Sequence, residues 1–208
     1  MAEKFDPGNA SELENPERLA ELPPADIAGL LGLTGAETLV DFGAGTGMYS
    51  LPLADALPEG IVYAVDEQDV LLDRLRDKLK DHPPRGRVEP TLSVDGRVPL
   101  PGGIAERMVM INVIHHVNDD PDTLAEIARL LAPGGQLAVI DFAQMDRPVG
   151  PPNDHVLSLD EARAVVAGMG LRELSVHQPG EIGRYHIAIL CERPVQDAAA
   201  PVGATVAP

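Results

Sequence analysis

A glycine-rich turn near residue 43 is the strongest chemical signal in the sequence. The segment TLVDFGAGTGMYSLPLA places Gly43, Gly45 and Gly47 between a β-branched apolar run and an apolar helical pattern. Glycine permits tight backbone angles and lets a ligand lie directly against the main chain. Dinucleotide-binding turns read G-x-G-x-x-G, whereas this turn reads G-x-G-x-G and has Met48 at the place of their third glycine. The preceding carboxylate, Asp41, opposes a phosphate and favours a ligand with a cationic amino-acid end.

Further polar residues follow the next apolar runs in the sequence. They are Asp66 and Glu67 after the second run, Asp95 and Gly96 after the third, and Asn112, His115 and His116 after the fourth. A carboxylate after the second strand can accept hydrogen bonds from two ribose hydroxyls. Because ligands of open α/β sheets bind beyond the carboxyl ends of the strands, we expect these residues to share one site.

Taken in order, these motifs resemble those of the class I S-adenosylmethionine (SAM) methyltransferases, over about residues 23–193. The first motif of that family is an acidic residue followed by x-G-x-G-x-G, which Asp41 and the three glycines match. The unit TLAEIARLLAPGGQLAVIDF is typical of the branch that includes ubiquinone and menaquinone-biosynthesis methyltransferases. The resemblance implies SAM as cofactor, S-adenosylhomocysteine (SAH) as product and a small-molecule methyl acceptor.

The resemblance also implies individual cofactor contacts. Asp66 would bind the ribose, Asp95 would bind the adenine amino group, and Asn112 would lie near the methionine part of SAM. The cofactor-binding residues that we predict are Asp41, Gly43, Ala44, Gly45, Gly47, Tyr49, Asp66, Glu67, Asp95, Gly96 and Asn112. Two alternatives stay open, namely that Asp66 only caps the following helix and that Asp95 is an ordinary turn residue.

A hydroxyl or amine acceptor needs a base, and histidine is the usual candidate. We predict His115 or His116 first, and His155, in a Gly-Pro-Pro loop after the fifth run, second. Neighbouring residues point in different directions, so we expect only one of the pair to face the pocket. No role is assigned to His82, His177 or His186. The sequence gives no support for a metal site, because it lacks cysteine clusters and an H-E-x-x-H helix.

The elements that position these residues alternate along the chain. Seven short apolar runs predict strands, and helical patterns lie at 48–57, 68–80, 121–131 and 160–167. Such alternation predicts βαβ units and a parallel sheet covered on both faces. Only HQPGEIG joins the last two runs, which is too short for a parallel crossover. We therefore predict an α/β, Rossmann-like doubly wound seven-stranded sheet, mostly parallel, with one antiparallel strand near the C-terminus.

The chain of 208 residues divides into a predicted methyltransferase domain and two flanks. Residues 25–193 form the domain, and residues 1–24 are an acidic helical extension, either a lid carrying Phe5 or a solubilising segment. Residues 194–208 are rich in Ala, Pro and Val, which predicts a disordered tail.

Composition narrows the functions further. The chain has 33 acidic and 16 basic residues and a net charge of -17, which disfavours nucleic acid and anionic membranes as partners. Its one cysteine, Cys191, and its acidic start favour a reducing compartment, most simply the cytoplasm. A nicotinamide-dependent oxidoreductase and a non-catalytic SAM-binding partner protein remain as alternatives. The acceptor, the methylated atom and the oligomeric state are not specified by the sequence.

Overall fold

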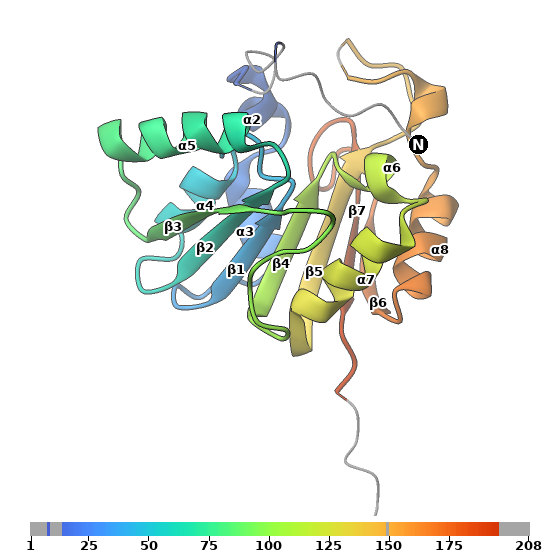
Figure 1. Ribbon diagram of the computed structural model, residues 1–208. Helices are drawn as coiled ribbons and strands as arrows, with labels where there is room; N and C mark the ends of the chain where they lie inside the picture. The colour runs from blue at the N-terminus through green and yellow to red at the C-terminus, as the bar shows by residue number, and fades with distance from the viewer. Residues whose placement is uncertain (1–7, 9–13, 149, 196–208) are drawn as a thin grey trace, which may run out of the picture.

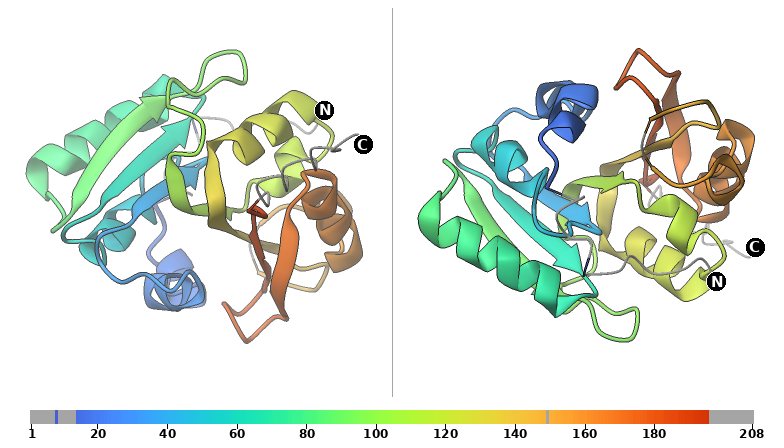
Figure 2. Two further views of the ribbon diagram at one scale, coloured as in Figure 1. Left: turned by 90° about the horizontal axis from the view of Figure 1, so that it is seen from below. Right: turned by 90° about the horizontal axis from the view of Figure 1, so that it is seen from above.

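The computed structural model describes residues 8, 14–148 and 150–195, which form a seven-stranded sheet with helices on both faces (Figures 1 and 2). The strand order is β3-β2-β1-β4-β5-β7-β6. The strands are β1 Thr38–Phe42, β2 Ile61–Asp66, β3 Arg87–Leu92, β4 Ala105–Ile111, β5 Leu131–Phe142, β6 Arg172–His177 and β7 His186–Glu192. The helices are α2 Glu17–Glu21, α3 Pro24–Leu30, α4 Ser50–Asp55, α5 Asp69–Asp81, α6 Ile114–Val117, α7 Pro121–Leu130 and α8 Leu159–Gly168, with the 3-10 turn η2 at Asn153–His155.

The predicted fold class is confirmed. The pairs among β3, β2, β1, β4 and β5 are parallel, whereas β7 runs antiparallel to both β5 and β6. The last strand therefore inserts between β5 and β6. This insertion sets Phe142, the last residue of β5, opposite His186, the first residue of β7. It brings the start of β7 to the edge of the sheet where the parallel strands end.

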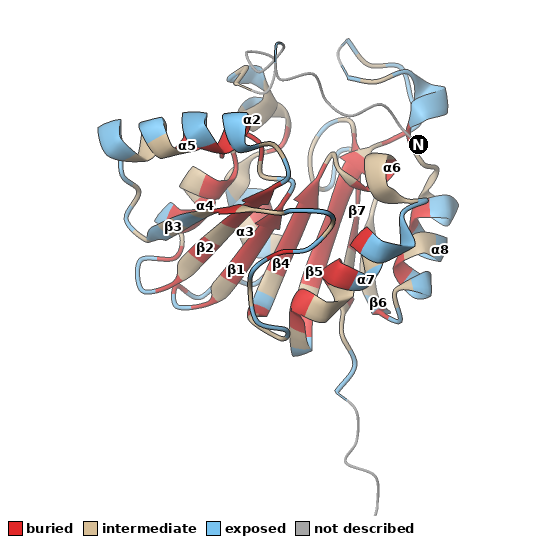
Figure 3. Cartoon of the chain, viewed as in Figure 1, coloured by how far each residue is buried: buried red, intermediate tan, exposed pale blue. Residues whose placement is uncertain are grey.

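Alternate residues of each central strand pack against different helices. On one face Val109 and Ile111 of β4 pack with buried side chains of α3 and α4. On the other face Met108 and Met110 pack with side chains of α6 and α7. Strands buried on both faces need near-continuous apolar runs, as the sequence of β4 shows. Figure 3 shows the central strands buried and the outer surfaces of α5 and α8 exposed.

Helix boundaries differ from the sequence patterns mainly at the glycine turn and after α7. The apolar pattern at 48–57 becomes the shorter α4, because the turn continues to the N-cap residue Tyr49. The helix at 121–131 ends one residue earlier, and β5 begins at Leu131 and takes in the APGG segment that the sequence predicts as a turn. In the part of the chain described, the helices are all too short or too polar to cross a membrane.

The segment before β1 lies across the ends of the strands and is fixed by specific contacts. Leu22 is fully buried in the core beneath α3. The Tyr49 hydroxyl donates to the carbonyl of Arg18 at 3.1 Å, and the Arg184 amide donates to the carbonyl of Glu21 at 2.9 Å. This segment forms one side of the cavity described below. The predicted tail at 194–208 lies outside the described residues from 196 onward, as does Phe5.

Candidate functional site

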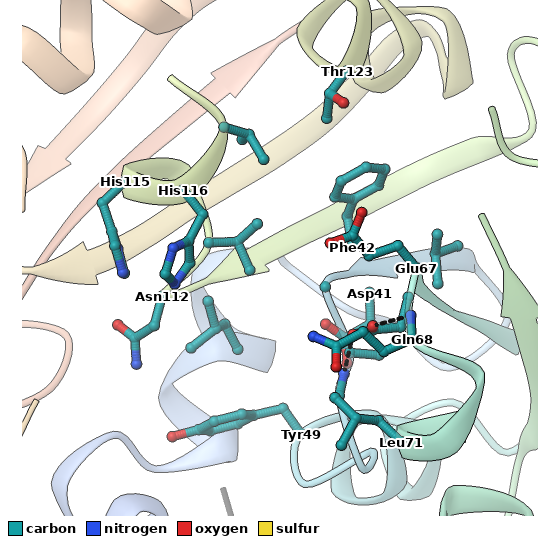
Figure 4. Close-up of a pocket in the computed structure, with 18 of the residues that line it drawn as sticks. Asp41, Phe42, Tyr49, Glu67, Gln68, Leu71, Asn112, His115, His116 and Thr123 are labelled. Carbon is teal, nitrogen blue, oxygen red and sulfur yellow. Dashed lines mark hydrogen bonds between the residues drawn. The ribbon is translucent and has the colours of Figure 1, made fainter. Parts of the chain in front are cut away.

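A cavity of about 1110 Å³ opens at the carboxyl ends of the parallel strands (Figure 4). It lies where the strand order reverses between β1 and β4, which is the usual ligand position in open α/β sheets. The predicted residues that line it are Asp41, Gly43, Ala44, Gly45, Tyr49, Asp66, Glu67, Gly96, Asn112, His115 and His116. Three predicted residues, Gly47, Asp95 and His155, are not among the described residues that line it.

The glycine turn after β1 needs glycine for both its backbone and its packing. Gly43 has φ +79°, and a Cβ there would lie 2.4 Å from Cγ2 of Val113. The main-chain N–H groups of Gly43 and Ala44 both donate to the carbonyl of Val65, at 2.8 and 2.9 Å. These bonds hold the turn against the end of β2. Gly47 is buried under Leu75 of α5, so its role is helix packing and not contact with the cavity.

Two buried carboxylates flank this turn. Asp41 accepts a hydrogen bond from the Ser50 hydroxyl at 2.5 Å, and burial, together with the nearby charge of Asp66, raises the pKa of Asp41 to about 6. Asp66 accepts main-chain hydrogen bonds from Gly45 at 2.8 Å and Gln68 at 2.9 Å. Burial raises the pKa of Asp66, and the hydrogen bonds from these two N–H groups offset part of that rise. Asp66 therefore joins the glycine turn to the start of α5, while Glu67 beside it is exposed and lines the cavity.

Left-handed backbone marks the ends of β3 and β4. Among the described residues, Asp95 (φ 50°) and Asn112 (φ 58°) are the non-glycine residues with positive φ. Such strain concentrates at functional sites. Asn112 lines the cavity, and its buried Oδ1 has no hydrogen-bond partner among the described residues. Asp95 instead lies exposed on the turn closed by Val94 and Arg97, so its adenine contact stays a prediction.

Both predicted histidines of the pair line the cavity, which corrects the expectation that only one would. They lie in the short helix α6, where neighbouring residues are about 100° apart and not on opposite sides. Their ring centroids are 4.0 Å apart. Figure 4 shows Asn112, His115 and His116 grouped on one side of the cavity, across from Asp41, Glu67 and Gln68.

His115 is held by a carboxylate that sequence reasoning did not assign to the site. Its Nδ1 lies 2.9 and 2.8 Å from the two oxygens of Asp141, at the end of β5. Both residues are buried, with exposures of 6% for His115 and 2% for Asp141. The Phe142 amide also donates to Asp141, at 2.7 Å. An acidic residue at the end of the run QLAVIDF was the signal that could have identified it.

His116 differs from His115 in its surroundings. Its buried Nδ1 has no partner among the described residues, and burial, reinforced by neighbouring His115, lowers the pKa of His116. His155 lies exposed in η2 and is not among the described residues that line the cavity, although Gly150 and Pro151 of the same loop are. The cavity is lined instead by His186, to which the sequence assigned no role, and by Arg18 of α2.

The arrangement has two chemically different halves. The half around the glycine turn offers main chain and carboxylates, and the Asn112 amide lies opposite it at the end of β4; these groups suit the hydroxyls and amino group of a cationic nucleoside. The half at the ends of β4, β5 and β7 offers a buried His–Asp pair beside Phe142 and His186. Together they define an α/β domain with a site suited to a nucleoside cofactor, next to a second compartment that contains a candidate general base.

Comparison with known proteins shows which proteins the chain resembles. Residues 40–139 match the family described as "Methyltransferase domain". The chain is 26% identical over 151 residues to 27-O-demethylrifamycin SV methyltransferase of Amycolatopsis mediterranei, covering 73% of this chain and 55% of the relative. It is 31% identical over 118 residues to the ubiquinone/menaquinone biosynthesis C-methyltransferase UbiE of Bordetella parapertussis, covering 56% and 45%. The chain thus spans about half the length of these curated relatives.

A solved structure agrees over nearly the whole fold. A SAM-dependent methyltransferase from Aquifex aeolicus superposes with a TM-score of 0.83 at 28% identity, covering 90% of this chain and 98% of that one. The chain is therefore similar to SAM-dependent methyltransferases, UbiE among them, both over residues 40–139 and in its overall fold, and SAM is the cofactor that this similarity supports.

Proposed function

We propose that this protein transfers the methyl group of SAM to a hydroxyl group of a small-molecule acceptor, with His115 as the general base. The observation that carries the proposal is the buried pair of His115 and Asp141 facing the glycine turn across one cavity. A non-catalytic SAM-binding protein needs no such base, and a nicotinamide oxidoreductase is disfavoured because Met48 replaces the third glycine of the dinucleotide-binding turn.

The residues of the cofactor half fit SAM. The turn at Gly43 is bare main chain where a Cβ has no room, and Asn112 Oδ1 is buried with no partner in the described part of the chain, as expected of an atom that binds a ligand amino or hydroxyl group. Glu67 and Asp66 stand where ribose hydroxyls are expected, with Glu67 exposed to the cavity. We propose that these residues hold the cofactor, with Asp41 near its cationic end. When bound, SAM supplies an electrophilic methyl group and leaves as SAH.

The chain's own contribution is proton removal and alignment. Asp141 accepts from Nδ1 of His115, which leaves Nε2 as the nitrogen with a lone pair for the acceptor hydroxyl. Nε2 takes that proton as the oxygen attacks, and the buried carboxylate stabilises the imidazolium that forms. The Phe142 amide and Asp141 fix the ring from the end of β5, so that the base is already oriented before the acceptor binds.

The acceptor half favours a small molecule. The relatives are named for methylating a demethylrifamycin and for quinone biosynthesis, and both names denote small molecules. A net charge of -17 opposes nucleic acid. We further propose that the protein works in the cytoplasm, because its cysteine is single and buried. We also propose that residues 14–21, which include α2, act as a lid. The lid proposal draws on two contacts, the ion pair of Glu14 with Lys78 at 2.8 Å and the bonds of Lys78 to Thr46 in the glycine turn.

The test begins with the cofactor. SAH should raise the melting temperature of the purified protein and bind measurably by calorimetry, whereas NADH should do neither. Labelled SAM is then incubated with a panel of hydroxylated, amine and thiol acceptors, and transfer is expected to the hydroxylated members. Stabilisation by NADH and not by SAH would overturn the proposal.

The base is tested with matched histidine variants. His115→Gln should lower kcat for a hydroxyl acceptor by about 10²- to 10⁴-fold, because general-base catalysis contributes that much, and leave the SAH dissociation constant within about twofold. His82→Gln is the control, since His82 is exposed at the end of α5, far from the lining residues. Equal activity of the two variants would contradict the assignment of His115.

A further inference from the structure

One buried histidine of the cavity is used neither by the cofactor half nor by the proposed base. His186 is the first residue of β7, and it pairs in register with Phe142 at the end of β5. Its side chain lines the cavity and is 3% exposed. The adjacent residue of β5, Asp141, holds His115. Two imidazoles are therefore anchored on consecutive positions of one strand, at the acceptor half of the cavity.

The ring of His186 has no hydrogen-bond partner on either nitrogen. Both Nδ1 and Nε2 are buried, and neither bonds to another described residue. The contrast with His115 is direct, because that equally buried ring is satisfied by Asp141. An unsatisfied buried polar atom costs about 1–3 kcal/mol, so an idle packing role would favour an apolar side chain here. Because the residue lines the cavity, a turn of its ring toward the cavity would let a ligand there supply the missing partner.

The surroundings of His186 keep its imidazole neutral. Burial, with smaller contributions from the positive charges of Arg18 and Arg147, lowers the pKa of His186 to about 4, against the opposing charge of Asp141. A neutral ring offers one N–H donor and one bare nitrogen acceptor. The neutral imidazole therefore suits an uncharged polar group such as a hydroxyl or carbonyl, and it forms no ion pair with a carboxylate.

The wall that carries His186 is aromatic. The imidazole stacks on the ring of Phe142, with centroids 4.6 Å apart and planes 28° apart. The guanidinium of Arg147 lies 4.9 Å from the centre of the same phenyl ring, and its N–H groups bond to the carbonyls of Ala143 and Pro151. These contacts fix Phe142 at the edge of the cavity. An aromatic ligand body can pack against the edges of these stacked rings.

We propose that His186 is a specificity-determining residue for the methyl acceptor. In this proposal His115 receives the hydroxyl that is methylated, and His186 hydrogen-bonds a second, uncharged polar group on the same flat ring system. The chemical class is thus an aromatic or quinol-like ring with two separated oxygen substituents. The inference rests on the proposed function for the role of His115, but the binding of such a ligand does not require methyl transfer.

The first experiment needs no acceptor. His186→Phe keeps the ring stack on Phe142 and removes both unsatisfied nitrogens, so the melting temperature of the ligand-free protein should rise by about 2 to 6 °C. His186→Leu should also leave the melting temperature unchanged or raise it. This second variant controls for steric strain in His186→Phe, whose phenyl ring is larger than the imidazole. A fall of more than 4 °C in both variants would show that His186 is structural and would overturn the proposal.

The second experiment uses two fluorescent probes on the SAH-saturated protein. The chain has no tryptophan, so naphthol fluorescence can be read without interference from that residue. The wild type should bind 2,6-dihydroxynaphthalene about tenfold more tightly than 2-naphthol. His186→Phe should bind both equally, while His186→Gln, which keeps a donor and an acceptor, should retain most of the preference.

The outcomes separate this inference from the proposed function. No preference in the wild type, or a preference unchanged in His186→Phe, would overturn the role of His186 even if methyl transfer is observed. A preference lost in His186→Phe would support it even if labelled SAM gives no methylated product. The SAH dissociation constant should stay within about twofold in all variants, since His186 lies in the acceptor half.

Discussion

Asp141→Asn is the most informative single change at the proposed base. The carboxylate has two oxygens, and each accepts a main-chain N–H, from Phe142 at 2.7 Å and from His115 at 3.3 Å, besides facing Nδ1 of the His115 ring. Asparagine has one oxygen and one NH2 group. In either orientation of the amide, the NH2 group faces a main-chain N–H donor. Leaving that buried donor without an acceptor costs about 1–3 kcal/mol.

The geometry decides which orientation the asparagine takes. The bond from the Phe142 amide is the shorter one, so the oxygen should stay there and the NH2 should face His115. The NH2 then takes the place of the nearer oxygen, 2.8 Å from Nδ1 against 2.9 Å for the other, and its donation to Nδ1 would place the ring proton on Nε2. A proton on Nε2 blocks the nitrogen that accepts the hydroxyl proton. We therefore expect kcat/KM for a hydroxyl acceptor to fall by about 10²- to 10³-fold.

The assay measures initial rates of methyl transfer from labelled SAM at saturating cofactor. SAH affinity should change by less than about twofold, and the melting temperature should fall by no more than about 8 °C, for a loss of about 2 kcal/mol. Asp146→Asn, the same change on an exposed side chain, is the control. In a His115→Gln background Asp141→Asn should cause little further loss, because the two residues act as a unit. Activity of folded Asp141→Asn within threefold of wild type would refute the reasoning.

Three further predictions follow from the cofactor half and its cover. Asp41→Asn should stabilise the ligand-free protein at pH 7 and weaken SAH binding. Because the pKa of Asp41 in the folded state is raised to about 6, the contribution of this carboxyl to stability falls as the pH rises from about 4 to 6. Chemical unfolding across that range should therefore show a flatter dependence of stability on pH in the variant than in the wild type. Gly43→Ala should abolish SAH binding by calorimetry and lower the melting temperature, because φ +79° and the 2.4 Å approach to Val113 leave no room for a Cβ; retained binding would contradict this. Lys78→Met removes the ion pair with Glu14 of the proposed lid and two bonds to Thr46 of the glycine turn. It should raise the SAH dissociation rate several-fold in stopped-flow measurements, with the equilibrium fold intact; an unchanged rate would argue against a lid.

Much of the cofactor half could be predicted from the sequence, because its signals are local. Gly43 and Asp41 are adjacent in the chain to the strand that positions them, and the backbone freedom of glycine is a property of the residue itself. The alternation of strands and helices predicts a parallel sheet, and parallel strands bring their carboxyl ends to one edge. Asp66, Glu67, Gly96 and the other predicted lining residues therefore meet in space although they lie far apart in sequence.

The errors arose where local geometry differs from a simple pattern. The sequence predicts that one of His115 and His116 faces the cavity, but a turn of helix after β4 presents both. His155 follows a loop that is long enough to reach the site, and the chain path leaves it exposed. Gly47 belongs to the motif by spacing, yet the packing of α5 buries it away from the cavity.

The sequence by itself indicated the class of fold, the resemblance to SAM-dependent methyltransferases and the cofactor, since each rests on residues read in order along the chain. Only the tertiary structure decided what the acceptor half contains. The insertion of β7 between β5 and β6 sets His186 against Phe142, and the parallel pairing of β4 with β5 sets His115 against Asp141. These contacts join residues that are 26 to 44 positions apart. Strand order creates them, and strand order is a property of long-range packing that no local pattern encodes.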